Sequence, residues 1–294
     1  MPVEISKENI IKIPHNLIVK IQAVYDNLKT AEKKVADLLL NNPQYFSTAT
    51  IVEASTKAGC SEATFTRLSK RLGFKGYPEL KSALMEITDD DKIVPYENIL
   101  DEDSCDTAVA KVFEAAIQSL RDTLNILDIN KYKAVVNALS KANKVMLCGS
   151  GDAFAVALSG YQKFIRIGFN ATVSADIDVE LIIASGLKKN DVVIAISHSG
   201  KTKSVVDIVK IAKNNGAKII SITNFPVSPL TKNSDIVLLT AAFSEHADGE
   251  IMAKRITELC ILESIFVNVL LDNKTKLSTN VKKSNDALEL NKLR

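Results

Sequence analysis

The stretch DVVIAISHSGKTKSVVDIVKIAKNNG, residues 191–216, decides the fold of the larger part of the chain. It begins with an apolar run typical of a buried strand and ends with apolar residues at helical spacing. Between the two lies a short turn, SHSGKT at 197–202. A strand that leads directly into a helix is the unit from which parallel sheets are built. Open sheets of this kind bind ligands at the carboxyl ends of their strands.

The alternation of strand and helix repeats on both sides of this stretch. Buried strands are expected at 144–149, 171–174, 191–197, 217–223 and 235–239. Helices are expected at 107–127, 131–142, 153–168, 178–187 and 203–216. The apolar segment 256–271 contains Glu258 and Glu263 and is too short to cross a bilayer, so we expect a buried helix there. These elements predict an α/β domain with a five-stranded parallel sheet flanked by helices.

The residues before this sheet predict helices only. Apolar residues recur at helical spacing, with helices expected at 16–28, 30–42, 50–58 and 61–74. The stretch 86–106 then carries nine acidic residues and one lysine, which favours an exposed linker. We therefore expect two domains with a linker and a tail: an all-α bundle at 1–88, an acidic linker at 89–106, the α/β domain at 107–275, and a polar tail or helix at 276–294.

The bulk composition excludes several classes of protein. The chain has 294 residues, 46% hydrophobic and 24% charged, which suits a globular protein of two domains. Its formal net charge is only +2, so a nucleic-acid surface has to arise from local clustering. The N-terminus lacks a signal-peptide pattern, and we expect a cytoplasmic protein without a membrane segment. The cysteines are far apart and lack metal-ligand spacing, so we expect reduced thiols and neither a metal nor a cofactor: Cys60, Cys105, Cys148 and Cys260.

Residues 50–74 have the helix-ending and helix-capping residues of a helix-turn-helix motif. A helix ends at Gly59, which permits a tight turn. Ser61 then stands where the next helix needs an N-cap. We expect Cys60 and Phe65 to pack together across this cap.

Rotation by about 100° per residue gives the second helix of this motif two faces. The apolar face contains Phe65, Leu68 and Leu72. The opposite face begins with small residues and ends with basic ones: Ala63, Thr64, Arg67, Lys70 and Arg71. The stretch 56–81 as a whole carries six Lys or Arg against two acidic residues. Such a face suits a DNA major groove, with early residues near base edges and cations on phosphates. The alternative is a helical domain with a solvated basic face.

Two turns of the predicted sheet suit a phosphate group. GSGDA at 149–153 and SHSGKT each join a strand to a helix, whose N-terminus offers free N–H groups to an anion. Gly200 lets the backbone approach closely. GSGDA lacks the spacing of a dinucleotide motif, and SHSGKT lacks the first half of a P-loop, so we expect a single small phosphate. Taken singly, each serine is also explained as a helix cap. The hydroxyl donors are Ser150, Ser197, Ser199 and Thr202.

The segment SEATFTRLSKRLGFKGYPELK, 61–81, resembles the signature of the RpiR/MurR-type transcriptional regulators. The matching positions are Ser61, Ala63, Thr64, Arg67, Leu72, Gly73, Phe74, Gly76, Tyr77, Glu79 and Lys81. Phe65 departs from the pattern, because the family usually has a smaller β-branched residue there. The resemblance implies that this helix binds operator DNA, with contacts from Ser61, Ala63, Thr64, Arg67, Lys70, Arg71 and Lys75.

The turn ISHSGKT resembles the phosphosugar-binding loop of the sugar isomerase (SIS) domain, and the two resemblances together cover roughly 15–290. Lys201 departs from the pattern, because many members have Glu at that place. The resemblance implies an SIS fold that binds a phosphorylated sugar as a homodimer or homotetramer. The ligand contacts that we expect are Ser150, Gly151, Ser197, His198, Ser199, Gly200, Thr202 and Glu250.

Three functions remain open at this point. A regulator that senses a phosphosugar is favoured, because a DNA-binding helix has no purpose in a plain isomerase. An SIS-type isomerase or lyase with a helical appendage is the alternative, and it would need a general base. The candidate bases are His198, Glu245, His246, Asp248 and Glu250. A scaffold that binds another protein through the helical domain is the third. We expect no catalysis.

Overall fold

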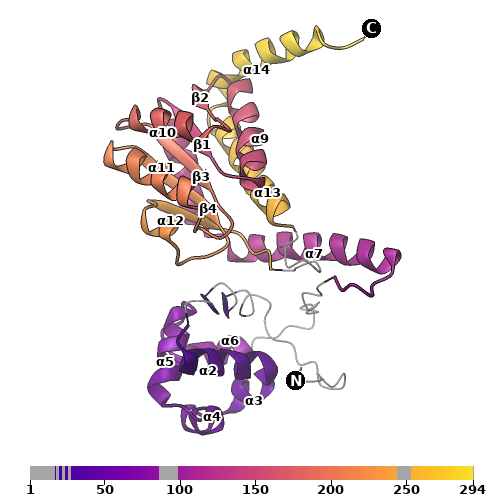
Figure 1. Cartoon of the computed structure of the whole chain (residues 1–294), viewed down its shortest axis with the longest axis vertical. Helices are drawn as coiled ribbons and strands as arrows, with labels where there is room; N and C mark the ends of the chain where they lie inside the picture. Colours follow the sequence, from indigo (N-terminus) through magenta and orange to yellow (C-terminus); the bar gives the residue numbers. More distant parts are fainter. Residues whose placement is uncertain are drawn as a thin grey trace. The chain divides into compact units, whose positions relative to one another are not determined.

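The computed structural model describes residues 17, 20–21, 24–25, 28–85, 99–243 and 253–293. Contacts between residues divide the chain into two compact units, Met1–Tyr96 and Glu97–Arg294. The described part of the first unit is helical, and the second contains a sheet between layers of helices (Figure 1). The predicted fold class is therefore confirmed.

The first unit has its core around Phe65. Its helices are α2 (Thr30–Asn41), α3 (Pro43–Thr48), α4 (Ile51–Ala58), α5 (Glu62–Arg71) and α6 (Tyr77–Met85). The Phe65 ring is fully buried between Phe46 and Tyr77, with ring centroids 5.8 Å and 5.4 Å away. The Tyr77 hydroxyl donates to the carbonyl oxygens of Phe46 (3.0 Å) and Ala49 (3.2 Å). The residue that departs from the family pattern thus lies in the core, joining α3, α5 and α6.

The second unit is built on a parallel five-stranded sheet with the strand order β2-β1-β3-β4-β5. The strands are β1 (Val145–Cys148), β2 (Ala171–Thr172), β3 (Val192–Ile196), β4 (Lys218–Thr223) and β5 (Ile236–Leu239). The chain runs outward from β1 to β2 and then crosses to β3 on the other side of β1. This reversal is a topological switch point, which opens a crevice beyond the carboxyl ends of β1 and β3.

Helices cover both faces of this sheet. They are α7 (Cys105–Ile126), α8 (Ile129–Ser140), α9 (Asp152–Arg166), α10 (Ile177–Ser185), α11 (Lys203–Asn214), α12 (Pro229–Lys232), α13 (Lys254–Asp272) and α14 (Lys274–Glu289). In β1, Val145 and Leu147 belong to the core under α8, α9 and α13, whereas Met146 and Cys148 belong to the core under α10 and α11 (Figure 1). The sheet is buried on both sides, which explains its continuous apolar strands.

The helix expected to be buried at 256–271 is only half-buried. It runs as α13 with Ile261, Leu262, Ile265 and Val269 in the core. Phe266 and Leu270 are partly buried against this core, whereas four other apolar side chains are exposed: Ile256, Leu259, Val267 and Leu271. The prediction of a buried helix was wrong for that face, because apolar residues on every side of a helix do not show which side is covered. Among the described residues, no helix has both the length and the apolar character needed to span a bilayer.

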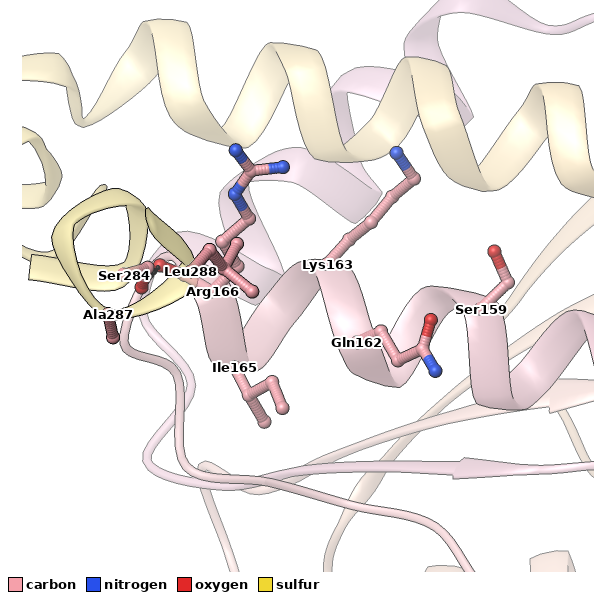
Figure 2. A pocket seen from close by; sticks show the side chains of 8 residues that line it. All are labelled: Ser159, Gln162, Lys163, Ile165, Arg166, Ser284, Ala287 and Leu288. Carbon is pink, nitrogen blue, oxygen red and sulfur yellow. Dashed lines mark hydrogen bonds between the residues drawn. The ribbon is translucent and has the colours of Figure 1, made fainter. Parts of the chain in front are cut away.

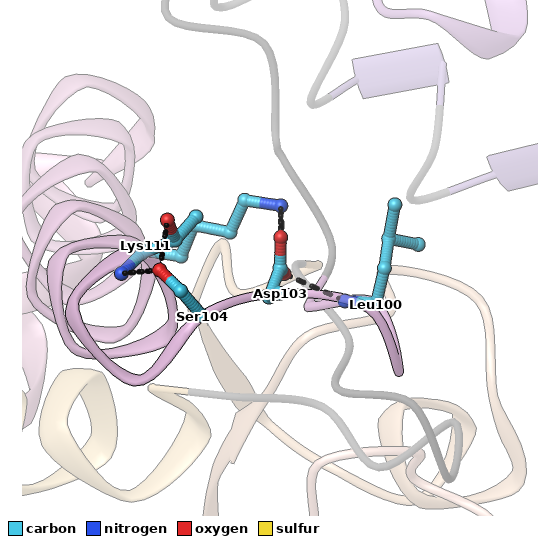
Figure 3. Close-up of polar contacts among 5 residues, drawn as sticks. Leu100, Asp103, Ser104 and Lys111 are labelled. Atoms are coloured by element: carbon cyan, nitrogen blue, oxygen red, sulfur yellow. Dashed lines mark hydrogen bonds and ion pairs between the residues drawn. The ribbon is translucent and has the colours of Figure 1, made fainter.

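The start of α7 is fixed by a small polar cluster (Figure 3). Asp103 accepts hydrogen bonds from the Leu100 amide (2.8 Å) and from Lys111 Nζ (2.8 and 3.0 Å). Ser104 is the N-cap, and its Oγ accepts from the Thr107 amide at 3.2 Å. The helix therefore begins at Cys105, two residues before the expected start. Part of this acidic stretch therefore forms the N-terminal cap of α7 and is not only an exposed, charged linker.

Truncation of Phe65 tests the core of the first unit. Phe65→Ala should lower its free energy of unfolding by about 3–5 kcal/mol, because the buried ring leaves a cavity between three helices. Phe65→Leu should cost clearly less, since most of the volume is retained. Urea unfolding followed by circular dichroism measures both. Equal stability of the alanine variant and the wild-type protein would contradict this account of the core.

Candidate phosphate pocket and nucleic-acid face

The two predicted phosphate turns meet at one pocket of about 270 Å³ beyond the carboxyl ends of β1 and β3. They are brought together because β1 and β3 pair directly, with Val145 opposite Val192 and Cys148 opposite Ala195. Five of the predicted ligand residues line the pocket: Ser150, Ser197, His198, Ser199 and Thr202. The lining also includes Asp152, Ala153, Lys254 and Glu258. Glu250 and the candidate bases Glu245, His246 and Asp248 lie outside the described residues.

Gly200 fixes the shape of the turn after β3. Its φ is +63°, and a Cβ at this position would collide with the side chain of Ser228. Its carbonyl oxygen accepts from the Leu230 amide at 3.0 Å, and its amide donates to the carbonyl oxygen of Ser197 at 3.1 Å. Only glycine allows both the left-handed conformation and this close approach. Gly151 has a φ of +60° at the start of α9 and has a similar backbone role.

The hydroxyl groups of this turn point to ligand binding better than to helix capping. Thr202 occupies the N-cap position of α11, yet its side chain caps no amide of that helix. Instead its Oγ1 lies 3.1 Å from the Oγ of Ser197. The Oγ of Ser199 accepts from the Lys201 amide at 3.2 Å, while the Lys201 side chain is exposed. Ser197 and Thr202 therefore form a hydroxyl pair at the start of a helix, where an anion is favoured.

Three helices begin at the pocket. Asp152 is the first residue of α9, Thr202 precedes α11, and Lys254 is the first residue of α13. The partial positive charges of the three helix N-termini add up there. Sequence patterns did not reveal the contribution of α13, because its apolar periodicity predicted only a core helix. The available signal was Glu258, an acidic residue inside an otherwise apolar segment.

Asp152 does not leave a free negative charge in the pocket. Its carboxylate forms ion pairs with Lys254 at 3.0 Å and with Arg255 at 3.6 Å. The repulsion of a phosphate that Asp152 would exert if it pointed inward is thus offset by two cations from α13. This pair also ties the first turn of α9 to the first turn of α13.

Two buried titratable groups line the pocket. Burial lowers the pKa of His198 to about 4, and the charge of Lys254 adds to this shift. Burial raises the pKa of Glu258 to about 8; Lys254 opposes the shift and Asp152 adds to it. Both side chains are therefore neutral at pH 7. Within the described residues, neither ring nitrogen of His198 nor Oε1 of Glu258 has a hydrogen-bond partner. Buried polar atoms without partners are unusual, and here they line a site for a polar ligand.

A larger groove of about 710 Å³ lies between α9 and α14 (Figure 2). Its cations are already engaged: Lys163 pairs with Glu263 at 2.5 Å, and Arg166 donates to Asn285 Oδ1 at 2.8 Å. It has an apolar part from Ile165 and Leu288, and no strand ends there. The pocket at the switch point therefore suits an anion better than this groove does. No group of His, Cys, Asp and Glu side chains suited to a metal ion occurs among the described residues.

The turn of the helix-turn-helix motif has the expected geometry. Gly59 has a φ of +58° and ends α4, and Cys60 packs against the core that contains Phe65. Ser61 is at the N-cap position of α5, but its Oγ lies 3.1 Å from the Thr64 hydroxyl and caps no amide.

Most of the predicted DNA-contact residues are exposed: Ser61, Ala63, Arg67, Lys70, Arg71 and Lys75. Thr64 is an exception, because only 4% of it is exposed. The prediction that Thr64 shares the outer face was wrong. The face of α5 that is buried against the core is wider than its apolar residues alone indicated, because it also includes Ser69. Arg71 Nε lies 3.4 Å from a carboxylate oxygen of Glu32 on α2, so this cation is partly drawn to its own unit.

Comparison with known proteins agrees with the two expected kinds of domain. Residues 15–90 match the helix-turn-helix domain of the rpiR family, and residues 138–269 match the SIS domain. An HTH-type transcriptional regulator from Thermotoga maritima is 34% identical over 253 residues, which cover 85% of this chain and 90% of the relative. The transcriptional regulator RpiR from Escherichia coli is 30% identical over 254 residues and 86% of each chain.

Solved structures share the fold. Vibrio vulnificus NanR aligns over 95% of this chain and 100% of its own, with a TM-score of 0.58 and 23% identity. The sugar isomerase domain of an RpiR transcription factor from Sphaerobacter thermophilus covers 60% of this chain and 98% of its own, with a TM-score of 0.56 and 20% identity. With a family-type helix-turn-helix followed by an SIS domain, the chain belongs to the RpiR family of helix-turn-helix transcriptional regulators.

Proposed function

We propose that this regulator senses a phosphorylated sugar in the pocket at the switch point and binds operator DNA through α5. The observation that carries the proposal is the meeting of two hydroxyl-rich turns and three helix N-termini at one small pocket. Such a site suits one phosphate group. The Vibrio vulnificus NanR structure, which was solved in complex with ManNAc-6P, adds support because it shares this fold.

The two ends of the pocket suit the two parts of a sugar phosphate. Ser197, Ser199 and Thr202 offer hydroxyl donors at the start of α11, where we place the phosphate. Lys254 and Glu258 lie at the start of α13 and offer a cation and a neutral carboxylic acid to the sugar hydroxyls. Ser150 and the backbone at Gly151 complete the phosphate end. Glu250 stays a candidate contact from the sequence.

We also propose that the protein performs no catalysis. An isomerase needs a base with a pKa matched to its task, held within reach of the proton that it removes. Among the described pocket residues, Glu258 is protonated at neutral pH, and neither ring nitrogen of His198 has a hydrogen-bond partner such as the carboxylate that orients a catalytic histidine. The relatives named above are transcriptional regulators. Turnover of a hexose or pentose phosphate would instead support the isomerase alternative.

The DNA contacts that we propose are the exposed members of the predicted face: Ser61, Ala63, Arg67, Lys70, Arg71 and Lys75. We propose further that the chain acts in the cytoplasm as a homodimer or homotetramer, since dimers bind paired half-sites. In this proposal the unit at 1–88 binds DNA, and the unit at 107–275 senses the sugar phosphate.

Loss of a phosphate donor should uncouple sensing from DNA binding. Ser199→Ala should weaken binding of the active sugar phosphate by about 10-fold or more, because a hydrogen bond to a charged group is lost. Its DNA affinity without effector should stay unchanged. Ser159→Ala, a serine that lines the groove between α9 and α14, is the matched control and should bind like the wild-type protein.

The measurement is a titration of hexose 6-phosphates, N-acetylated amino sugar 6-phosphates and pentose 5-phosphates, with inorganic phosphate as reference. Binding to a promoter fragment upstream of the gene is followed in parallel by fluorescence anisotropy. The sensor proposal fails when no phosphosugar changes the DNA affinity of the wild-type protein.

Loss of a cation on α5 should weaken DNA binding alone. Arg67→Ala should raise the Kd for promoter DNA by about 10-fold and reduce the slope of log Kd against log salt by about 1 for a lost phosphate contact. Lys34→Ala removes an exposed cation from α2 and is the control. Both variants should bind the sugar phosphate normally. Equal DNA affinities of the two variants would argue against α5 as the recognition helix.

Effector binding should weaken as the pH rises through about 8. Glu258 ionises over this range, and its carboxylate then repels the phosphate, which already carries both of its charges above pH 7. We expect the Kd to rise by about 10-fold between pH 7 and 9. Calorimetric titration of Glu258→Gln should give a nearly flat profile. A wild-type profile as flat as that of the variant would show that Glu258 lies outside the reach of the ligand.

A further inference from the structure

The described lining of the phosphate pocket carries no net side-chain charge at pH 7. Its one basic side chain is Lys254, and Asp152, which lines the same pocket, lies 3.0 Å from it. Burial favours the neutral forms of His198 and Glu258 at this pH. The charges of Lys254 and Asp152 therefore cancel, and the hydroxyl groups and helix N-termini are left to attract an anion.

The position of Asp152 is only partly explained by its helix. An acidic residue in the first turn stabilises a helix, and Asp152 is the first residue of α9. That stabilisation does not require the carboxylate to line the pocket or to pair with the lysine of another helix. The Lys254 side chain is only 22% exposed, so this pair is less screened by water than a surface ion pair. Arg255, the second cation beside Asp152, is 57% exposed and is not part of the described lining.

An anion without a sugar meets two obstacles in this pocket. A sphere of 270 Å³ is about 8 Å across, so an anion inside it lies close enough to Asp152 to be repelled. Phosphate and sulfate both carry about two negative charges at neutral pH, and the attraction of Lys254 for them is offset by its carboxylate partner. A small anion at the start of α11 also leaves the far end of the pocket unfilled.

A sugar hydroxyl meets the same lining differently. A carboxylate has about four acceptor positions, so an ion-paired carboxylate still accepts a hydrogen bond from a hydroxyl. Such a bond to a charged group is stronger than one between neutral groups. Both ring nitrogens of His198 and Oε1 of Glu258 are buried without partners in the described part of the chain, and they also suit hydroxyl groups. The acid therefore has opposite effects on the two kinds of ligand.

We propose that Asp152 makes the pocket select a phosphorylated sugar over phosphate or sulfate alone, because its carboxylate repels the anion and accepts from a hydroxyl of the sugar. The inference rests on the proposed phosphosugar site and names a residue that determines its selectivity. Hydrolysis of any sugar phosphate releases inorganic phosphate, which would compete for the same hydroxyl donors. A group that penalises the wrong ligand is a common source of specificity.

Sulfate binding to the full chain tests the repulsion, because sulfate carries two charges and no proton at pH 7. The temperature of unfolding is followed against sulfate concentration at constant ionic strength, which gives an apparent Kd. Asp152→Asn should lower this Kd by about 10-fold, because the repulsion is removed and Lys254 is released. In the double variant of Asp152→Asn and Ser199→Ala most of the gain should be lost, since Ser199 lines the same pocket.

The matched control is Glu263→Gln. Glu263 of α13 pairs with Lys163 of α9 at 2.5 Å, so it joins the same two helices, and neither residue is part of the described pocket lining. This variant should bind sulfate like the wild-type protein. An unchanged or higher Kd of Asp152→Asn, an equal gain in Glu263→Gln, or a gain that survives Ser199→Ala would overturn the proposal.

Calorimetric titration with the tightest-binding sugar phosphate of the panel above tests the selectivity. The Kd of Asp152→Asn for it should stay close to that of the wild-type protein, because the relief of repulsion is offset by a weaker hydrogen bond to the sugar. The ratio of the Kd for sulfate to the Kd for the sugar phosphate should then fall by about 10-fold. Equal gains for both ligands would show an acid that weakens every anion alike, and would overturn the proposal. A wild-type protein that binds no phosphosugar would overturn the proposed function itself, whatever the result with sulfate.

Discussion

The direct pairing of β1 with β3 determines where the rest of the second unit lies. These strands are sequence-distant, yet their register brings the end of β1 beside the end of β3. The connection through α9, β2 and α10 lies on one side of β1, and β3 begins the series on the other side. Both helices that follow the paired strands therefore begin at the same crevice. This crevice is where the turn at Gly200 and the hydroxyl pair of Ser197 and Thr202 lie. The first turn of α13 reaches the same crevice.

Most of the fold and half of the site were predictable because they follow from preferences of residues that are close together in the sequence. The strands and the left-handed Gly59 follow from apolar periodicity and from the conformational freedom of glycine, which act within a few residues. Lys254 and Glu258 escaped prediction because they reach the pocket only through packing of α13 against α9. Thr64 was misplaced for a related reason: the width of a buried face depends on what covers it, and neighbouring helices cover more of α5 than its apolar residues require. Long-range packing, which no local pattern contains, decides such cases.

Burial favours the neutral form of two acids in the second unit, and one of them, Glu258, lines the pocket. Besides Glu258, burial raises the pKa of Glu180 to about 7, and Oε1 of each carboxyl has no partner within the described residues. A raised pKa means that the folded state holds protons more tightly than the unfolded state. The stability from this proton binding is complete below the ordinary pKa of Glu and is lost as the pH rises through about 7 to 8. An apolar residue in place of Glu258 would avoid this loss, and a buried acid with a raised pKa in a pocket is typical of a functional site.

Helix α7 turns small and polar residues to the core and leaves large apolar side chains such as Phe113 and Leu124 exposed. Hydrogen bonds of Thr123 and of the cluster of Asp103 and Lys111 hold the polar side of α7 inside the unit, although the buried Ser119 hydroxyl has no partner within the described residues. The helix lies directly after the DNA-binding unit in the chain and packs against α13, whose first turn lines the pocket. Helix α13 thus contacts both the pocket and the helix that follows the first unit, and a contiguous packed element of this kind is what coupling between two sites requires.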